Sequence, residues 1–175
     1  MRSVDIANLF ILRHGDKLHL TNLSLNKLVY YAQVEALKAN SQKPLFADGI
    51  EAWDYGPVEP AVYHAFKGYG DAQITAPCSA LLNENEDLGF AIGFVDLVAE
   101  NYGSLSAFDL VNLSHRPGGA WRMKYTGARG VPITVEDILS SSDYRESPDS
   151  STTFEAALQN VQDTWPNALR MLETS

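Results

Sequence analysis

The chain has 175 residues, of which 45% are hydrophobic and 20% are charged. This length suits one compact domain, and this apolar content excludes a wholly disordered chain. Lys and Arg total 13 against 22 Asp and Glu, and the resulting formal net charge of −9 repels nucleic-acid phosphates. We therefore expect no direct nucleic-acid binding, whereas an acidic surface suits a basic partner.

Cysteine usage and apolar runs indicate the compartment. Cys78 is the only cysteine, which excludes an intramolecular disulfide and a thiolate-rich metal site. The apolar run at residues 9–12 is too short for the core of a signal peptide, and no run approaches the roughly 20 apolar residues that cross a bilayer. We therefore expect a cytoplasmic protein that makes no membrane contact.

Helical spacing of apolar residues is clear in the first part of the chain. A short helix is expected between Val4 and Gly15. A longer one starts at a cap on Thr21 or Asn22 and ends before Asn40. Its apolar stripe consists of Leu25, Leu28, Val29, Ala32 and Ala36.

Glycine and proline then mark a break in the helical pattern. They interrupt residues 43–57, which we interpret as a loop or a short extended segment. Pro60 suits the first turn of a third helix, which ends near Gly68.

The second half of the chain repeats the helical pattern. A helix is expected over residues 86–102, and Ser106 can cap another that ends before Pro117. The residues after Tyr125 are interpreted as a loop, and Thr134 with Asp137 resembles a capping pattern for a helix around Ile138.

These elements predict a mainly α fold: a single compact helical domain with at most a short extended segment around residues 50–58. Residues 140–153 are rich in Ser and Asp and are interpreted as a linker. Residues 154–175 are interpreted as a C-terminal amphipathic helical segment. Its apolar stripe is Phe154, Leu158, Val161 and Trp165.

Motifs for catalysis, metals and cofactors do not emerge from the spacing. The four histidines form no i, i+4 pair, so no metal site is expected; they are His14, His19, His64 and His115. No Gly-x-Ser-x-Gly elbow is present, and residues 127–130 lack the Lys-Ser/Thr of a phosphate loop. We therefore expect no catalytic residues and no cofactor.

The densest cluster of unusual residues is at positions 51–60. Two prolines fix the backbone φ angle there, and Gly56 permits a backbone shape that other residues resist. The segment therefore presents its side chains rigidly. We favour a rigid turn whose Trp53 and Tyr55 pack in the core, and the alternative is a recognition surface that uses them as anchors. The carboxylates of the segment could in principle do acid–base work.

Two adjacent tyrosines, Tyr30 and Tyr31, lie beside Lys27 on the second expected helix. Adjacent helical residues diverge by about 100°, so we expect only one of the tyrosines deep in the core. The other could contact a partner.

Several of these segments together resemble a known family, the Panacea domain. This is the antitoxin domain of a class of bacterial and phage toxin–antitoxin pairs, also described as phage-associated protein. The matching segments are residues 25–33, 44–46, 50–58, 62–63 and 66–70, and a later Ser-His…Trp element at 113–121. The string Ala-Trp-x-Tyr-Gly-Pro-Val at residues 52–58 is the most specific, and the resemblance covers about residues 4–125.

The resemblance implies a mainly helical, non-enzymatic domain, here residues 1–139, that neutralises a cognate toxin by direct protein contact. The expected partner-binding residues are Lys27, Tyr30, Tyr31, Trp53, Asp54, Tyr55, Pro57, His115 and Trp121. Two alternatives stay open. One is an adaptor that hands a bound protein to a protease, and the other is a hydrolase or transferase that uses His115 with a nearby carboxylate.

Overall fold

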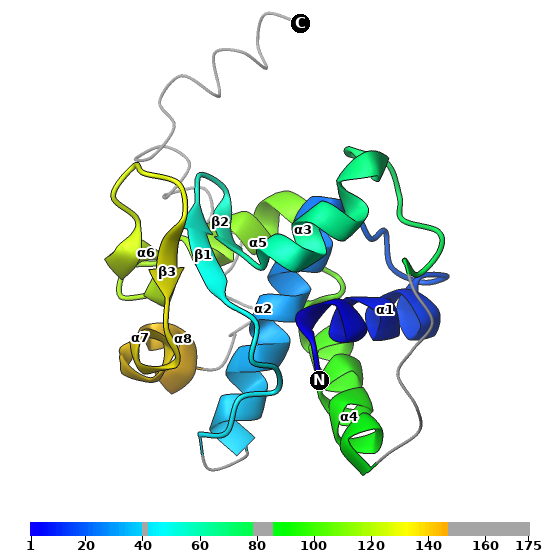
Figure 1. Cartoon of the computed structure of the whole chain (residues 1–175), viewed down its shortest axis with the longest axis horizontal. Helices are drawn as coiled ribbons and strands as arrows, with labels where there is room; N and C mark the ends of the chain where they lie inside the picture. Colours follow the sequence, from blue (N-terminus) through cyan, green and yellow to red (C-terminus); the bar gives the residue numbers. More distant parts are fainter. Residues whose placement is uncertain (40–41, 79–85, 147–175) are drawn as a thin grey trace, which may run out of the picture.

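Helix α2 (Asn22–Ala39) lies at the centre of the domain, and most other elements pack around it (Figure 1). The computed structural model describes residues 1–39, 42–78 and 86–146. Helices α1, α3, α4, α5 and α8 and strand β2 all contact α2. Helices make up most of the described elements, so the predicted mainly α fold is confirmed.

Because α2 is surrounded, it is buried on nearly all its faces rather than along one stripe. Tyr30 and Tyr31 are both buried, so the prediction that only one would be deep in the core is wrong. The Tyr31 ring stacks on Tyr102 of α4 at 4.6 Å between centroids, and the Tyr30 hydroxyl donates a hydrogen bond to Asp143 of α8. Partners on two sides of the helix thus cover both rings.

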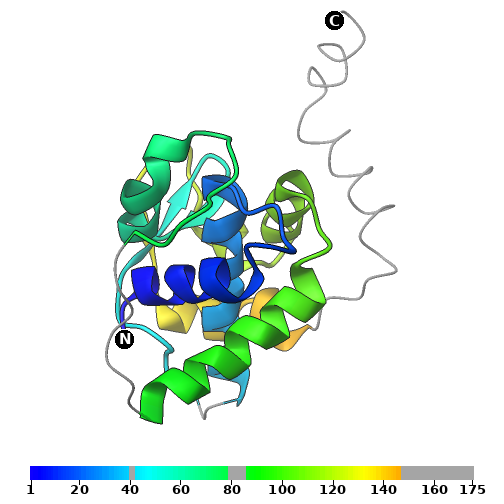
Figure 2. The same ribbon diagram turned by 90° about the vertical axis from the view of Figure 1, so that its right-hand side faces the viewer.

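Two helices cover one flank of α2. Helix α1 (Ser3–His14) and helix α4 (Glu86–Tyr102) pack against each other and against α2. Figure 2 shows α1 crossing beside α4. Arg13 at the end of α1 makes two hydrogen bonds to the Asp96 carboxylate of α4, at 2.8 and 2.7 Å. An exposed pair of this kind orients the helices more than it stabilises them.

Two shorter helices occupy the expected places. Helix α3 (Pro60–Phe66) starts at a proline and continues into the 3-10 turn η1 (Lys67–Tyr69). Helix α5 (Ala107–Ser114) is capped by Ser106, whose hydroxyl accepts a hydrogen bond from the Asp109 amide. Proline at the first turn and serine at the cap are the residues that stabilise helix starts.

A three-stranded antiparallel sheet forms the other flank. Strands β1 (Ile50–Trp53) and β2 (Gly56–Val58) form a hairpin in which Trp53 pairs with Gly56. This confirms the expected extended segment. Strand β3 (Val131–Ile133) joins the free edge of β1, giving the order β2-β1-β3.

The remaining helices lie around this sheet. Helix α6 (Ala120–Lys124) precedes β3 and helix α7 (Val135–Ser140) follows it, the latter with the predicted Thr134–Asp137 cap. Strand β3 corrects the interpretation of the residues after Tyr125 as a loop, and helix α6 was not predicted. Both elements are too short to produce a clear period in the sequence.

The packed domain extends past the expected boundary at residue 139. Helix α8 (Ser142–Arg145) contacts α2, and its Asp143 carboxylate accepts hydrogen bonds from the Tyr30 hydroxyl and the Ala120 amide at 2.7 and 2.9 Å. The start of the expected linker therefore belongs to the domain. The rest of the linker and the C-terminal amphipathic segment lie outside the described residues.

In the part of the chain that the structure describes, none of the helices combines the length and apolar character needed to span a bilayer.

We predict that Tyr30→Phe lowers the free energy of unfolding by about 1–3 kcal/mol, because it leaves the largely buried Asp143 carboxylate of α8 with one fewer hydrogen bond. Chemical denaturation measures this. The matched control is Tyr144→Phe, since Tyr144 is a half-buried tyrosine of α8 whose hydroxyl makes no hydrogen bond to the described residues. Equal losses in the two variants would contradict a special role for the contact between α2 and α8.

Candidate partner-binding site

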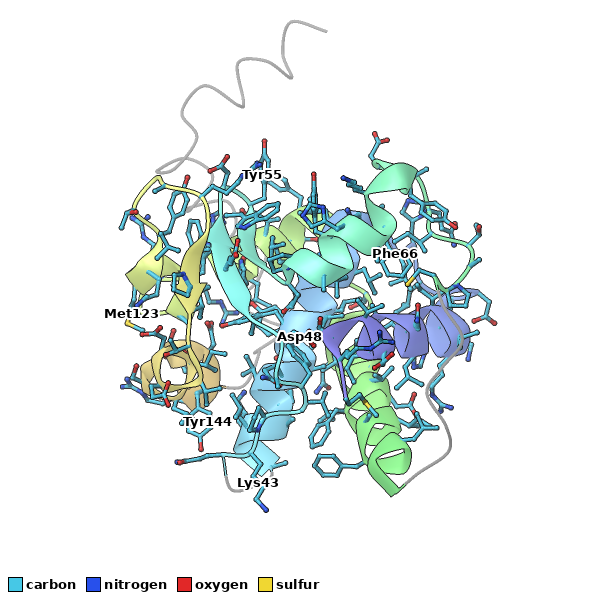
Figure 3. All side chains as sticks on the ribbon, in the orientation of Figure 1. Lys43, Asp48, Tyr55, Phe66, Met123 and Tyr144 are labelled. Carbon is cyan, nitrogen blue, oxygen red and sulfur yellow. The ribbon has the colours of Figure 1, made fainter. Side chains whose placement is uncertain are left out.

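The turn between β1 and β2 is the most exposed part of the predicted 51–60 segment. Asp54 and Tyr55 form this turn, and Tyr55 is 55% exposed. Figure 3 shows Tyr55 at the outer edge of the domain. The favoured interpretation of Tyr55 as a core residue is therefore wrong, because a two-residue turn at the end of a hairpin leaves no element above it. Trp53, at the end of β1, is half-buried.

Gly56 follows the turn and has a φ of +104°, a backbone conformation that strongly favours glycine. Its α-carbon also faces two side chains from helices α2 and α5. A β-carbon at this position would lie 2.5 Å from Ser114 Oγ and 2.8 Å from Lys27 Cε. The hairpin can therefore approach the helices this closely only with glycine at position 56.

Lys27 is completely buried beneath the hairpin, and its Nζ donates a hydrogen bond of 2.7 Å to the Pro57 carbonyl. Glu59 is also completely buried, and neither of its carboxylate oxygens has a hydrogen-bond partner in the described residues. Burial lowers the pKa of Lys27 to about 7 and raises the pKa of Glu59 to about 8. Each group partly offsets the shift of the other through its charge.

A stack of three rings supports the other side of the hairpin. The Trp121 ring of α6 lies parallel to the His115 ring, with 3.6 Å between their centroids. The Tyr125 ring also stacks on Trp121, with 4.6 Å between their centroids. The Trp121 indole donates to the Trp53 carbonyl at 2.7 Å, and the Tyr125 hydroxyl donates to Asp54 Oδ1 at 2.9 Å. The turn is thus held by both its backbone and a side chain.

His115 serves as a packing surface in this stack. Burial, together with the nearby Lys27 charge, lowers the pKa of His115 to about 4. The imidazole is therefore neutral at pH 7. Its buried Nε2 atom has no hydrogen-bond partner within residues 1–39, 42–78 and 86–146.

Trp53 is surrounded by groups that fix its ring. Its indole nitrogen donates to Glu51 Oε2 at 2.8 Å, the Tyr63 ring meets it edge-on at 4.8 Å, and the Arg129 guanidinium lies 4.6 Å from the ring centroid. Beside them lies a pocket of about 290 Å³, whose lining also includes Asp54 and Tyr55. We call this the Trp53 pocket.

The structure divides the nine predicted partner-binding residues into two groups. Trp53, Asp54, Tyr55 and His115 have accessible surface. The others are buried beneath or away from the hairpin: Lys27, Tyr30, Tyr31, Pro57 and Trp121. Direct contact of these five side chains with a partner protein requires the domain to open.

Sequence reasoning did not single out three residues of this site: Tyr63, Tyr125 and Arg129. Tyr63 has two weak signals, an apolar helical position and a place in the matching segment 62–63, and Arg129 lies in a glycine-flanked loop that carries no motif. Among the described residues, no group of three His, Cys, Asp or Glu side chains is arranged to hold a metal ion.

We predict that Gly56→Ala is more destabilising than Gly127→Ala. Both glycines have a positive φ, but a β-carbon at Gly127 has nothing within 4 Å. Backbone strain alone costs about 1–2 kcal/mol, and the displacement of Lys27 and Ser114 adds about 1–3 kcal/mol at Gly56. Thermal or chemical denaturation compares the two variants. Equal losses would show that the hairpin does not need its close approach to the helices.

We also predict a pH-dependent effect of Glu59→Gln. Because its folded-state pKa is raised from 4.5 to about 8, the Glu59 contribution to stability is complete below pH 4.5 and is lost as pH rises through 8. Glutamine keeps the shape but does not ionise. Relative to the variant, the natural protein should therefore lose about 1–2 kcal/mol of unfolding free energy between pH 5 and pH 6.5.

Denaturant titrations at the two pH values measure this difference. The lowered pKa of His115 contributes a slope of opposite sign in the same range, and this slope cancels because both proteins contain His115. A difference between natural protein and variant that is the same at both pH values would contradict the assignment.

Comparisons with known proteins place this site within a family. Residues 25–122, which include the hairpin, Lys27 and Trp121, match the family described as "Antitoxin SocA-like, Panacea domain". The chain is also similar to a protein named "Antitoxin SocA" from Caulobacter vibrioides (strain NA1000 / CB15N), with 32% identity over 111 residues. The match covers 58% of this chain and 58% of that relative, so the chain spans little more than half the relative's length.

No solved structure matches the chain. The family match extends over more than half of the chain and contains the Ala-Trp-x-Tyr-Gly-Pro-Val string at residues 52–58. The chain therefore belongs to the SocA-like antitoxin family with a Panacea domain.

Proposed function

We propose that this chain is an antitoxin that neutralises a cognate protein toxin by direct protein–protein contact in the cytoplasm. The observation that carries the proposal is the family match over residues 25–122, which contains the hairpin and the His115 and Trp121 rings of the stack. The name of the relative from Caulobacter vibrioides points to the same role.

The contact surface that we propose is centred on the hairpin turn. Trp53, Asp54 and Tyr55 combine large aromatic surface with a carboxylate, and tryptophan and tyrosine are frequent anchors at protein interfaces. The turn is held by Lys27 from below and by Trp121 from the side. A turn that is already ordered loses less conformational entropy on binding, which favours tight association.

The buried residues of the predicted set have a supporting role in this proposal. Lys27 and Trp121 position the hairpin through its carbonyls, and Tyr30 connects α2 to α8. Substitution of these residues weakens toxin binding through the folded structure rather than through a lost contact.

The site geometry gives little support to a hydrolase or transferase. A histidine whose pKa is lowered to about 4 is a weak base at neutral pH. Ser114 and Lys27 approach the same glycine, but both are buried, and each donates its hydrogen bond to a backbone carbonyl. We therefore propose a non-enzymatic role. The net charge of −9 favours a basic protein over a nucleic acid as the partner.

We predict that the product of the adjacent gene co-elutes with this chain in size-exclusion chromatography after co-expression. The expected affinity is nanomolar, equivalent to about −12 kcal/mol. Tyr55→Ala should weaken the complex at least about tenfold while changing the free energy of unfolding by less than about 1 kcal/mol. Phe108→Ala is the matched control, because Phe108 is an aromatic residue on α5 that is exposed to a similar extent.

The same co-expression strain tests the alternatives through rescue of cell growth. A stable His115→Gln that binds the toxin but does not rescue growth would contradict the non-enzymatic role, because an amide cannot transfer a proton near neutral pH. If the toxin disappears only when both the chain and a cellular protease are present, the chain delivers the toxin to that protease. That result would contradict neutralisation by direct contact. Failure of the two proteins to co-elute would contradict the proposal as a whole.

A further inference from the structure

The Trp53 pocket already contains a cation bound to its principal aromatic ring. The Arg129 guanidinium lies 4.6 Å from the centroid of Trp53. Within the described part of the chain, the Arg129 side chain makes this ring contact and no hydrogen bond or ion pair. Arginine is the more frequent cation in such contacts, and tryptophan is the most favourable ring.

Arg129 reaches the Trp53 ring from a loop in which it is flanked by two glycines. Gly127 and Gly130 have φ values of +85° and +84°, and Arg129 itself is exposed. An exposed cation–π pair is weak, on the order of two- to fivefold in an equilibrium constant. Another guanidinium can therefore replace Arg129 on the ring at little cost.

The other groups around the pocket also suit a cation. Tyr55 and Tyr63 add aromatic surface, and Asp54 adds a carboxylate that is exposed at the turn. The Asp54 Oδ1 atom accepts a hydrogen bond from Tyr125, which fixes the carboxylate at the rim. The formal net charge of −9 attracts a basic partner to the domain as a whole.

We propose that the Trp53 pocket receives an arginine side chain of the protein partner, which replaces Arg129 on the face of Trp53. Arg129 is then an internal stand-in that occupies the ring in the free chain. Arginine is preferred to lysine because its planar guanidinium stacks on an indole while its N–H groups reach a carboxylate such as Asp54. This inference rests on the proposed function, because it names the chemistry of the partner at the same surface.

The test titrates the ¹⁵N-labelled full chain with N-acetyl-arginine amide and follows the Trp53 indole N–H signal by NMR, assigned with Trp53→Phe. N-acetyl-citrulline amide is the uncharged control probe. We expect the arginine probe to shift the Trp53 signal and the citrulline probe to shift it much less. Arg129→Gln should tighten binding of the arginine probe about two- to fivefold, because it removes the internal competitor.

Two further variants make the titration specific. Arg122→Gln changes the net charge equally, and Arg122 is an exposed arginine outside the pocket lining, so this variant should bind the probe as the natural protein does. Asp54→Asn should weaken probe binding about twofold or more. Equal shifts with both probes, or no tightening in Arg129→Gln, would overturn the proposal.

The titration needs no toxin, so its outcome is separate from the outcome of the co-elution experiment. If the arginine probe binds as expected and the adjacent-gene product does not co-elute, the pocket is supported and the proposed function fails. If the product co-elutes but Arg129→Gln leaves probe binding unchanged, the function is supported and the pocket assignment fails.

Discussion

The contact between Lys27 and the β1–β2 hairpin is the constraint on which the rest of the site depends. The Lys27 side chain is completely buried and ends in a hydrogen bond to the Pro57 carbonyl. An ammonium or amine group in this position is tolerated only if it finds a polar partner, and the backbone of β2 supplies one. The close approach that this bond requires is possible because Gly56 has no side chain to collide with Lys27 and Ser114.

From this contact the hairpin acquires a fixed position relative to helix α2. Helix α6 then secures its other side, because the Trp121 indole donates to the Trp53 carbonyl and Tyr125 donates to Asp54. The two turn residues are therefore exposed and yet ordered. This combination suits recognition of another protein, since a preordered surface keeps more of its interaction energy as affinity.

The elements that could be predicted from sequence are those whose signals are local. The apolar spacing of α2, the Ser106 and Thr134 caps and the proline at the start of α3 depend on residues within one or two turns. Strand β3 could not be predicted in this way, because its three residues become a strand only by pairing with β1 across about 80 residues of sequence. The burial of both Tyr30 and Tyr31 depends in the same way on α4 and α8.

The sequence by itself determined the helical class, the glycine and proline turn at residues 50–58 and the family to which the chain belongs. Only the tertiary structure decided which of the marked residues are accessible: it buried Lys27, Pro57 and Trp121 and exposed Asp54 and Tyr55. It also brought Arg129 onto Trp53. The physical reason is that burial and ring contacts depend on side chains from distant segments, whereas helix caps and turns depend on neighbours in the chain.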